Sequence, residues 1–196
     1  MTIKFGSGIK LGDGNVSPLK LTAGTIANAT LQSQSINSPG IWTVPFGIYS
    51  ITVTVTGGGG GGAGASDNEE PLYTGAAGGA GEVVQRILSV TSGTQYNITI
   101  GHGGSGGAVG YVGNNGGTTS FGSITAAGGG GGWGGMGVGG GGGGTYVPGS
   151  FESPQIYPGA RASGNGGPGG GYNESTENGL PGSNGGEGSV LIRWYQ

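Results

Sequence analysis

Glycine recurs at every third position along one stretch of the chain, and this period limits the possible folds more than any other feature. The stretch contains Gly101, Gly104, Gly107, Gly110, Gly113 and Gly116. The same spacing returns at Gly179, Gly182, Gly185 and Gly188. A period of three is the repeat of the polyproline-II helix, which has no hydrogen bonds within itself. The spacing therefore predicts extended helices that need neighbouring segments as hydrogen-bond partners.

Glycine is also concentrated in several further tracts, with 56 glycines among 196 residues in total. The tracts are 57–64, 75–81, 101–117, 128–144, 164–171 and 179–188. Ordering one residue costs about 1 to 2 kcal/mol of backbone entropy, and glycine has no side chain to bury in return. Tracts that pack side by side can form hydrogen bonds between their backbones, because no Cβ atom keeps them apart. We therefore expect packed polyglycine-II helices, with flexible linkers as the alternative.

Between the glycine tracts, apolar residues alternate with Ser and Thr, which is typical of half-buried strands. The predicted strands are 41–45, 48–56, 82–90, 94–100, 118–127 and 189–195. The third and fourth are separated by Thr91-Ser92-Gly93 and are predicted to form a hairpin. No segment has a convincing helical period. The expected fold is all-β, a small β-sandwich-like strand scaffold with packed polyglycine-II helices and essentially no α-helix.

The N-terminal part differs in composition from the rest. Residues 1–40 have few glycines and contain all the lysines, Lys4, Lys10 and Lys20. We expect two parts, an attachment or oligomerisation segment at 1–40 and a glycine-rich domain with a loop tip at 41–196. The N-terminus lacks the unbroken apolar stretch of a signal peptide, and no run approaches the length of a membrane span. Synthesis in the cytosol without membrane insertion is therefore expected.

Several function classes have little support in the residue inventory. The chain has no cysteine, one histidine (His102), and six Lys and Arg residues against nine Asp and Glu. The acidic group Asp67, Glu69 and Glu70 is interpreted as a solvated loop rather than a metal site. Few basic residues leave no patch to neutralise phosphates. We expect a protein that is not an enzyme, with no cofactor, no metal and no nucleic-acid partner.

Six segments resemble, in the same order, the glycine-rich domain at the ends of bacteriophage tail-fibre proteins. They begin with Trp-Thr-Val-Pro-Phe-Gly at 42–47, end with Gly-Gly-Glu-Gly-Ser-Val-Leu-Ile-Arg-Trp at 185–194, and include 50–62, 81–84, 89–101 and 113–122. The region is also similar to the distal domain of T-even phage tail-fibre adhesins. The resemblance implies a body of polyglycine-II helices whose far loops contact a host receptor.

The resemblance leads us to expect a tail-fibre tip adhesin, assembled in the host cytoplasm and located on the virion. Its partners would be a host surface glycan or outer-membrane protein and, through residues 1–40, another virion protein. The alternative is a structural virion decoration or fibre protein without receptor binding. Ice binding by a polyglycine bundle ranks third, because His, Ser, Ala, Val, Tyr and Asn interrupt the repeated small residues of 101–116.

The aromatic residues fall into two groups. Those on predicted strands are assigned to the core or its rim: Trp42, Tyr49, Tyr96, Phe121, Trp194 and Tyr195. Those in or beside glycine tracts are Tyr73, Tyr111, Trp133, Tyr146, Phe151, Tyr157 and Tyr172. Aromatic rings offer a large contact area to sugars or receptor loops. The predicted receptor-binding residues are Trp133, Tyr146, Phe151 and Tyr157, with Tyr73 and Tyr172 as weaker candidates and Arg161 as a charged donor. Alternatively, the rings cap the ends of the polyglycine helices.

Overall fold

The computed structural model describes residues 30–65, 74–133, 164–170, 172–173 and 178–196. A compact unit extends from Leu31 to Gln196. The described residues form strands, turns and extended segments without any helix, which confirms the all-β prediction. None of them therefore belongs to a helix long and apolar enough to cross a membrane.

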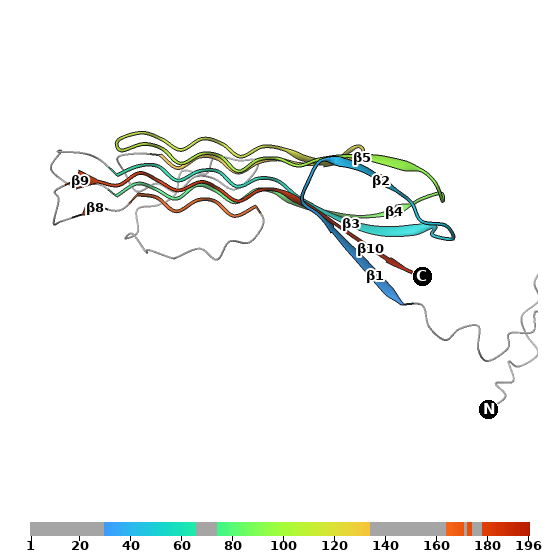
Figure 1. Ribbon diagram of the computed structural model, residues 1–196. Helices are drawn as coiled ribbons and strands as arrows, with labels where there is room; N and C mark the ends of the chain where they lie inside the picture. The colour runs from blue at the N-terminus through green and yellow to red at the C-terminus, as the bar shows by residue number, and fades with distance from the viewer. Residues whose placement is uncertain (1–29, 66–73, 134–163, 171, 174–177) are drawn as a thin grey trace, which may run out of the picture. The chain divides into compact units, whose positions relative to one another are not determined.

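The strands form two four-stranded antiparallel sheets and one small pair (Figure 1). The first sheet has the order β1-β10-β3-β4, with β1 at Leu31–Ile36, β10 at Ser189–Tyr195, β3 at Ser50–Thr56 and β4 at Val83–Ser89. The second has the order β2-β5-β6-β7, with β2 at Gly40–Thr43, β5 at Gln95–Thr99, β6 at Thr119–Phe121 and β7 at Ile124–Ala126. The pair consists of β8 (Tyr172–Asn173) and β9 (Asn178–Gly179).

Residues from both four-stranded sheets form one hydrophobic core. Alternate residues of β3 are buried, namely Ile51, Val53 and Val55. From the second sheet, the Trp42 and Phe121 rings meet with centroids 5.9 Å apart. Tyr96 and Trp194 pack against this core, as the alternation predicts. The core assignment is wrong for Tyr49 and Tyr195, which are exposed because one precedes β3 and the other lies on the outer face of β10.

The predicted hairpin of 82–90 with 94–100 is wrong. β4 pairs with β3, whereas β5 pairs with β2 and β6 in the other sheet. The turn itself is present, since the Thr94 amide donates to the Thr91 carbonyl at 3.1 Å and Gly93 has a φ of 81°. It carries the chain from one sheet to the other. The same turn residues serve a hairpin and a crossover between layers, so the local pattern does not distinguish them.

The compact unit begins ten residues before the boundary expected from composition. β1 pairs with β10 from Leu31↔Tyr195 to Ile36↔Val190 and so belongs to the glycine-rich unit. Residues 1–29, which contain the rest of the expected attachment segment, lie outside the described residues.

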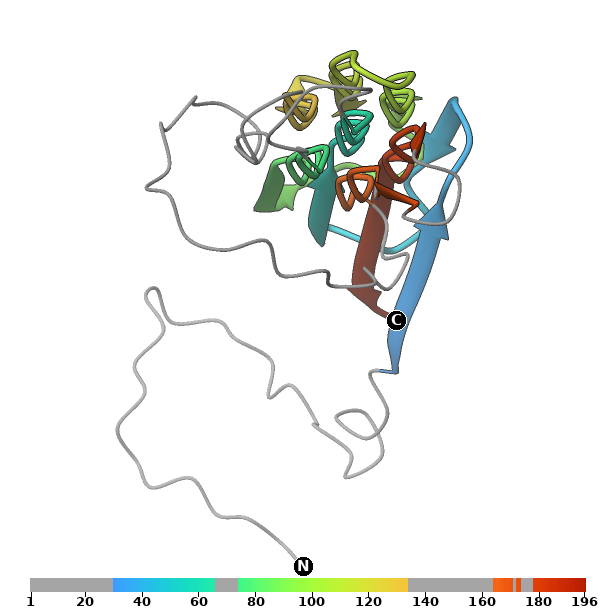
Figure 2. The ribbon, with the colours of Figure 1, turned by 90° about the vertical axis from the view of Figure 1, so that its left-hand side faces the viewer.

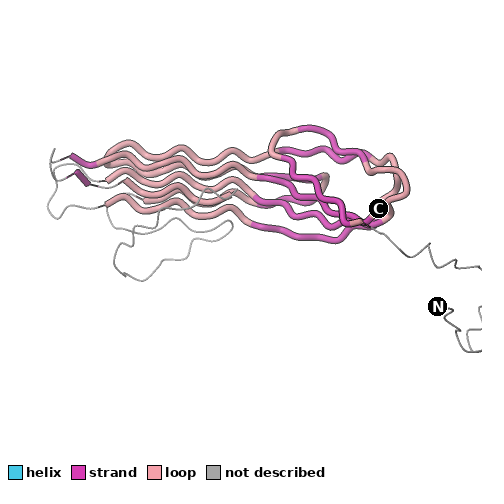
Figure 3. Tube along the Cα trace, turned by 60° about the horizontal axis from the view of Figure 1, so that its bottom comes forward, coloured by secondary structure: helices cyan, strands magenta, loops and turns pink. Residues whose placement is uncertain are grey.

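The glycine tracts form a bundle of extended segments around a central one. The central segment is 57–65, and the outer segments are 74–82, 101–108, 111–118, 127–133, 164–170 and 180–188. Figure 2 looks along the bundle and shows the teal central segment surrounded by the others. Most of the segments continue a strand directly, as Figure 3 shows where magenta turns to pink. β3, for example, runs into the central segment at Gly57.

Hydrogen bonds from the central segment rotate among its neighbours with a period of three. The amides of Gly57, Gly60 and Ala63 donate to segment 74–82 at 2.8 to 2.9 Å. Each of these three residues begins a triplet. The amide of the second residue in each triplet donates to segment 111–118, and the amide of the third residue donates to segment 180–188. Carbonyls of the central segment accept from 101–108, 127–133 and 164–170. This is the pattern of packed polyglycine-II helices, in which each helix bonds to neighbours on all sides.

Glycine is required at many of the positions where one segment faces another. A Cβ atom on Gly101, Gly104, Gly107, Gly113 or Gly116 would lie against a backbone carbonyl oxygen of a neighbouring segment. The prediction that these glycines face a packed surface is therefore confirmed. It is wrong for Gly110, which has open space around it and a φ of 77° in the turn between 101–108 and 111–118. The period of three thus spans two antiparallel segments joined by a turn.

Residues other than glycine occupy the outward positions of the outer segments. His102, Ser105 and Ala108 are exposed and alternate with buried Gly101, Gly104 and Gly107. Pro168 and Pro181 are likewise exposed. Proline has no N–H group, so at an outward position it leaves no backbone donor without a partner in the bundle.

Candidate functional site

The far end of the bundle is fixed by hydrogen bonds at the last residues of the central segment. The Ala65 amide donates to the Leu180 carbonyl at 3.0 Å, and the Ala65 carbonyl accepts from Gly110 at 2.7 Å. The Gly64 amide donates to the Tyr111 carbonyl at 2.9 Å. These residues therefore lie at one level, at the opposite end of the central segment from β3. We call this the distal end.

A tight turn shapes the described part of the distal end. The Tyr111 amide donates to the Ala108 carbonyl at 2.9 Å, and Gly110 adopts a φ of 77°. Such a positive φ favours glycine, because a Cβ atom would be strained there. The turn reverses the chain and places Tyr111 and Val112 directly after it.

Four large side chains are exposed near this end. Tyr111 is 70% exposed and Trp133 60% exposed, and Val112 and Leu180 are exposed as well. Tyr111 and Trp133 come from segments 111–118 and 127–133, which are hydrogen-bonded neighbours through Gly113 and Gly132. Leu180 begins segment 180–188. Segment 101–108 lies between this segment and 111–118 and is hydrogen-bonded to both. None of these four residues carries a charge, so the described part of this end is neutral and largely apolar.

Two further segments reach this end of the bundle. The Gly75 amide donates to the Gly170 carbonyl at 2.9 Å, and the Gly170 amide donates to the Ala63 carbonyl at 2.8 Å. Segments 74–82 and 164–170 therefore extend to the level of the last residues of the central segment.

The structure places only part of the predicted binding set. Trp133 is exposed near the distal end, and its role in binding stays a prediction. Tyr172 lies in β8 and pairs with Gly179 of β9. The remaining candidates lie outside the described residues: Tyr73, Tyr146, Phe151, Tyr157 and Arg161.

Two exposed apolar residues of the distal end were missed by the search for aromatic residues. Val112 follows the turn at Gly110, and Leu180 precedes Pro181. Val112 lies inside the period of three, between Gly110 and Gly113, and Leu180 lies between Gly179 and Gly182. The sequence therefore carries no signal that marks either residue as exposed at the end of a segment.

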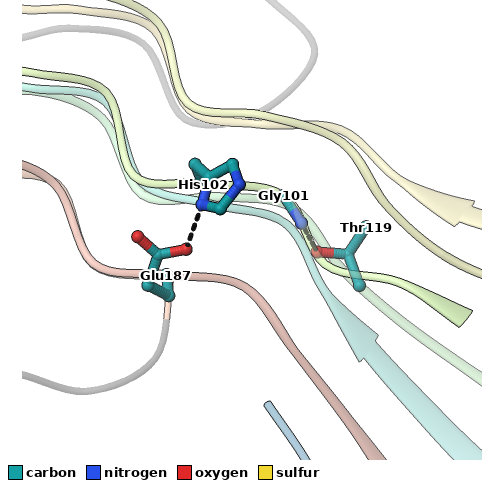
Figure 4. A network of polar contacts seen from close by, with 4 residues as sticks. All are labelled: Gly101, His102, Thr119 and Glu187. Carbon is teal, nitrogen blue, oxygen red and sulfur yellow. Dashed lines mark hydrogen bonds and ion pairs between the residues drawn. The ribbon is translucent and has the colours of Figure 1, made fainter. Parts of the chain in front are cut away.

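A polar cluster lies near the junction of the sheets and the bundle, away from the distal end (Figure 4). The Gly101 amide donates to Oγ1 of buried Thr119 at 3.0 Å. Nδ1 of His102 lies 3.0 Å from Oε2 of Glu187. Because the His102 and Glu187 side chains are exposed, this pair is a surface tether between segments 101–108 and 180–188. Among the described residues, no group of three His, Cys, Asp or Glu side chains could hold a metal ion.

Comparison with known proteins identifies the domain type. No curated protein sequence matches the chain. A family model described as a glycine-rich domain matches residues 33–160. This match starts within β1, covers both sheets except β10, and includes most of the segments that form the bundle. The chain therefore belongs to the glycine-rich domain family.

Proposed function

We propose that this chain is a phage virion protein, a tail-fibre tip adhesin that binds a host cell-surface receptor with the distal end of its bundle. The main supporting observation is the presence of exposed Tyr111, Val112, Trp133 and Leu180 at the end of a densely hydrogen-bonded scaffold. Recognition residues are commonly found on loops that a rigid scaffold positions.

The scaffold is well suited to this role because its backbone groups bond across many neighbouring segments. The turn at Gly110 is attached to the central segment by the bond to Ala65, and segment 127–133 by the bond from Gly132 to Gly61. Side chains presented by such fixed backbone lose little further entropy on binding. The proposed receptor is a host surface glycan or an outer-membrane protein. The proposed carrier is another virion protein, which binds the part of the N-terminal segment that precedes β1.

Adsorption of the purified full-length protein to cells tests this proposal. The fluorescently labelled protein is mixed with cells of the bacterium in which the encoding phage propagates, and bound protein is measured over a concentration series. We expect saturable binding that competes with adsorption of the phage. Periodate treatment of the cells would abolish binding to a glycan, and protease treatment would abolish binding to a protein.

Two matched variants locate the binding surface. Tyr111→Ala removes a ring at the distal end, and Tyr49→Ala removes a ring of similar exposure next to β3, at the far end of the sheets from the bundle. We expect adsorption to fall only for Tyr111→Ala. Absence of saturable binding by the wild-type protein would favour the structural virion component instead.

A further inference from the structure

The edges of the two four-stranded sheets differ in their protection against pairing with another chain. An edge strand presents unpaired N–H and C=O groups, and natural proteins protect such edges with short strands, prolines, bulges or inward-pointing charges. In the described part of the chain, the edges are β1 and β4 of one sheet and β2 and β7 of the other.

Three of these edges carry a recognised protective feature. β7 has only three residues, and β2 has four and is flanked by Pro39 and Pro45. In β4, Arg86 lies between Val84 and Leu88 on the same face of the strand, and both of these neighbours are partly buried and pack against the core. Its guanidinium group donates to the Gln85 carbonyl at 2.9 Å. A cation between two core-facing positions, which also bonds to the strand's own backbone, hinders the addition of a further strand to β4.

The edge formed by β1 has none of these features. It is six residues long, Leu31–Ile36, and contains no charge, proline or glycine. Its register with β10 is regular over all six pairs, so no bulge interrupts it. Ser33 and Ser35 are exposed, and their small side chains leave the edge accessible.

β1 is also held firmly in position. Oε1 of Gln34 accepts a 2.9 Å hydrogen bond from Nε1 of Trp42, which is buried in the core. This bond connects the β1 edge of one sheet with the β2 edge of the other. An incoming strand would therefore meet a preformed edge and would not have to order it.

We propose that this edge pairs with β1 of a second copy of the chain, antiparallel and about a twofold axis. Self-pairing suits β1 because an uncharged strand opposite itself brings no like charges together. A twofold contact uses the same surface on both copies, and twofold dimers are the commonest symmetric assembly. The pairing joins the two sheets into one with the order β4-β3-β10-β1-β1-β10-β3-β4. Because the strands are antiparallel, the two distal ends point in opposite directions.

Sedimentation equilibrium of the full-length protein tests the proposal, with samples between about 1 and 100 μM, the range in which moderate protein affinities are resolved. We expect a monomer–dimer equilibrium. Ser33→Glu places like charges across the twofold contact and is expected to weaken the dimer by about tenfold or more, while within one chain the new carboxylate faces Arg193 of β10, an opposite charge. Ser89→Glu, at an exposed serine on the protected β4 edge of the same sheet, is the control and should leave the dimer unchanged.

Crosslinking gives a second measurement that does not depend on a disruptive change. The chain has no cysteine, so Ser33→Cys introduces a single thiol. Residues opposite or diagonal across an antiparallel pair have Cβ atoms about 4.5 to 8 Å apart, within reach of a short bismaleimide. We expect a covalent dimer for Ser33→Cys and none for Ser89→Cys. A wild-type protein that stays monomeric at all concentrations, or a dimer that Ser33→Glu leaves unchanged, would overturn the proposal.

Discussion

The amide nitrogen of Gly61 lies 2.8 Å from the carbonyl oxygen of Asn114, a residue of another segment of the bundle. The Gly61 carbonyl in turn accepts a hydrogen bond from Gly132 at 2.8 Å. A Cβ atom on Gly61 would lie against the Ser105 carbonyl of a third segment. One residue thus meets three neighbours, and its backbone fills the space that a side chain occupies in an ordinary core.

The first prediction concerns this central position. Gly61→Ala places a methyl group inside contact distance of backbone atoms that the bundle holds on several sides. We expect the free energy of unfolding to fall by about 1 to 3 kcal/mol or more through overpacking. Chemical denaturation measures it. Gly40→Ala is the control, because a Cβ atom at Gly40 meets nothing within 4 Å, and its effect should remain within about 0.5 kcal/mol.

The second prediction compares two adjacent residues of an outer segment. Gly107 faces the neighbouring backbone near Tyr111 and Val112, whereas Ala108 is exposed. We expect Gly107→Val to destabilise the protein by about 1 to 3 kcal/mol and Ala108→Val to change stability by less than about 0.5 kcal/mol. Equal melting temperatures for the two variants would contradict the packed arrangement and favour flexible linkers.

The period of three could be interpreted from the sequence because outer segments have an outward position. There a side chain such as that of His102 or Ser105 costs nothing in packing, so glycine is needed only at the other two positions. The central segment has no outward position, and its uninterrupted run 57–62 therefore shows no period. An uninterrupted run is consistent with any glycine-rich segment. Its central place follows only from the hydrogen bonds to all neighbours.

Strand positions were largely predictable, whereas strand pairing was not. Alternation of Ser and Thr with Ile and Val marks β3 closely, and the apolar run Val190-Leu191-Ile192 after Gly188 marks β10. It does not tell which sheet β4 and β5 join, since both have one apolar face that any opposing layer can cover. For the candidate site, the aromatic type of Trp133 was enough to nominate it. Val112 and Leu180 were missed because their exposure depends on where each glycine segment ends.

A third prediction concerns the crossover between the sheets. Gly93 has a φ of 81° and open space around a Cβ position, so any cost of substitution comes from the backbone alone. Gly93→Ala is expected to reduce the free energy of unfolding by about 1 to 2 kcal/mol, the cost of a left-handed conformation for a residue with a Cβ atom. Gly93→Asn should cost less, since Asn tolerates this region better. The order of the two unfolding midpoints in urea checks this explanation.

The last prediction concerns Trp133, the exposed ring at the end of segment 127–133. If the distal end binds the receptor, Trp133→Ala should weaken adsorption to host cells by about 2 kcal/mol or more, the usual threshold for an interface hot spot. Its melting temperature should stay near that of the wild type, because much of the ring is exposed and truncating it leaves the backbone bonds of Gly132 in place. Phe46→Ala is the control, since Phe46 is 93% exposed in the turn that precedes β3. A lower melting temperature with unchanged adsorption per folded molecule would instead make Trp133 a cap of the bundle, and the structural role would then be favoured over receptor binding.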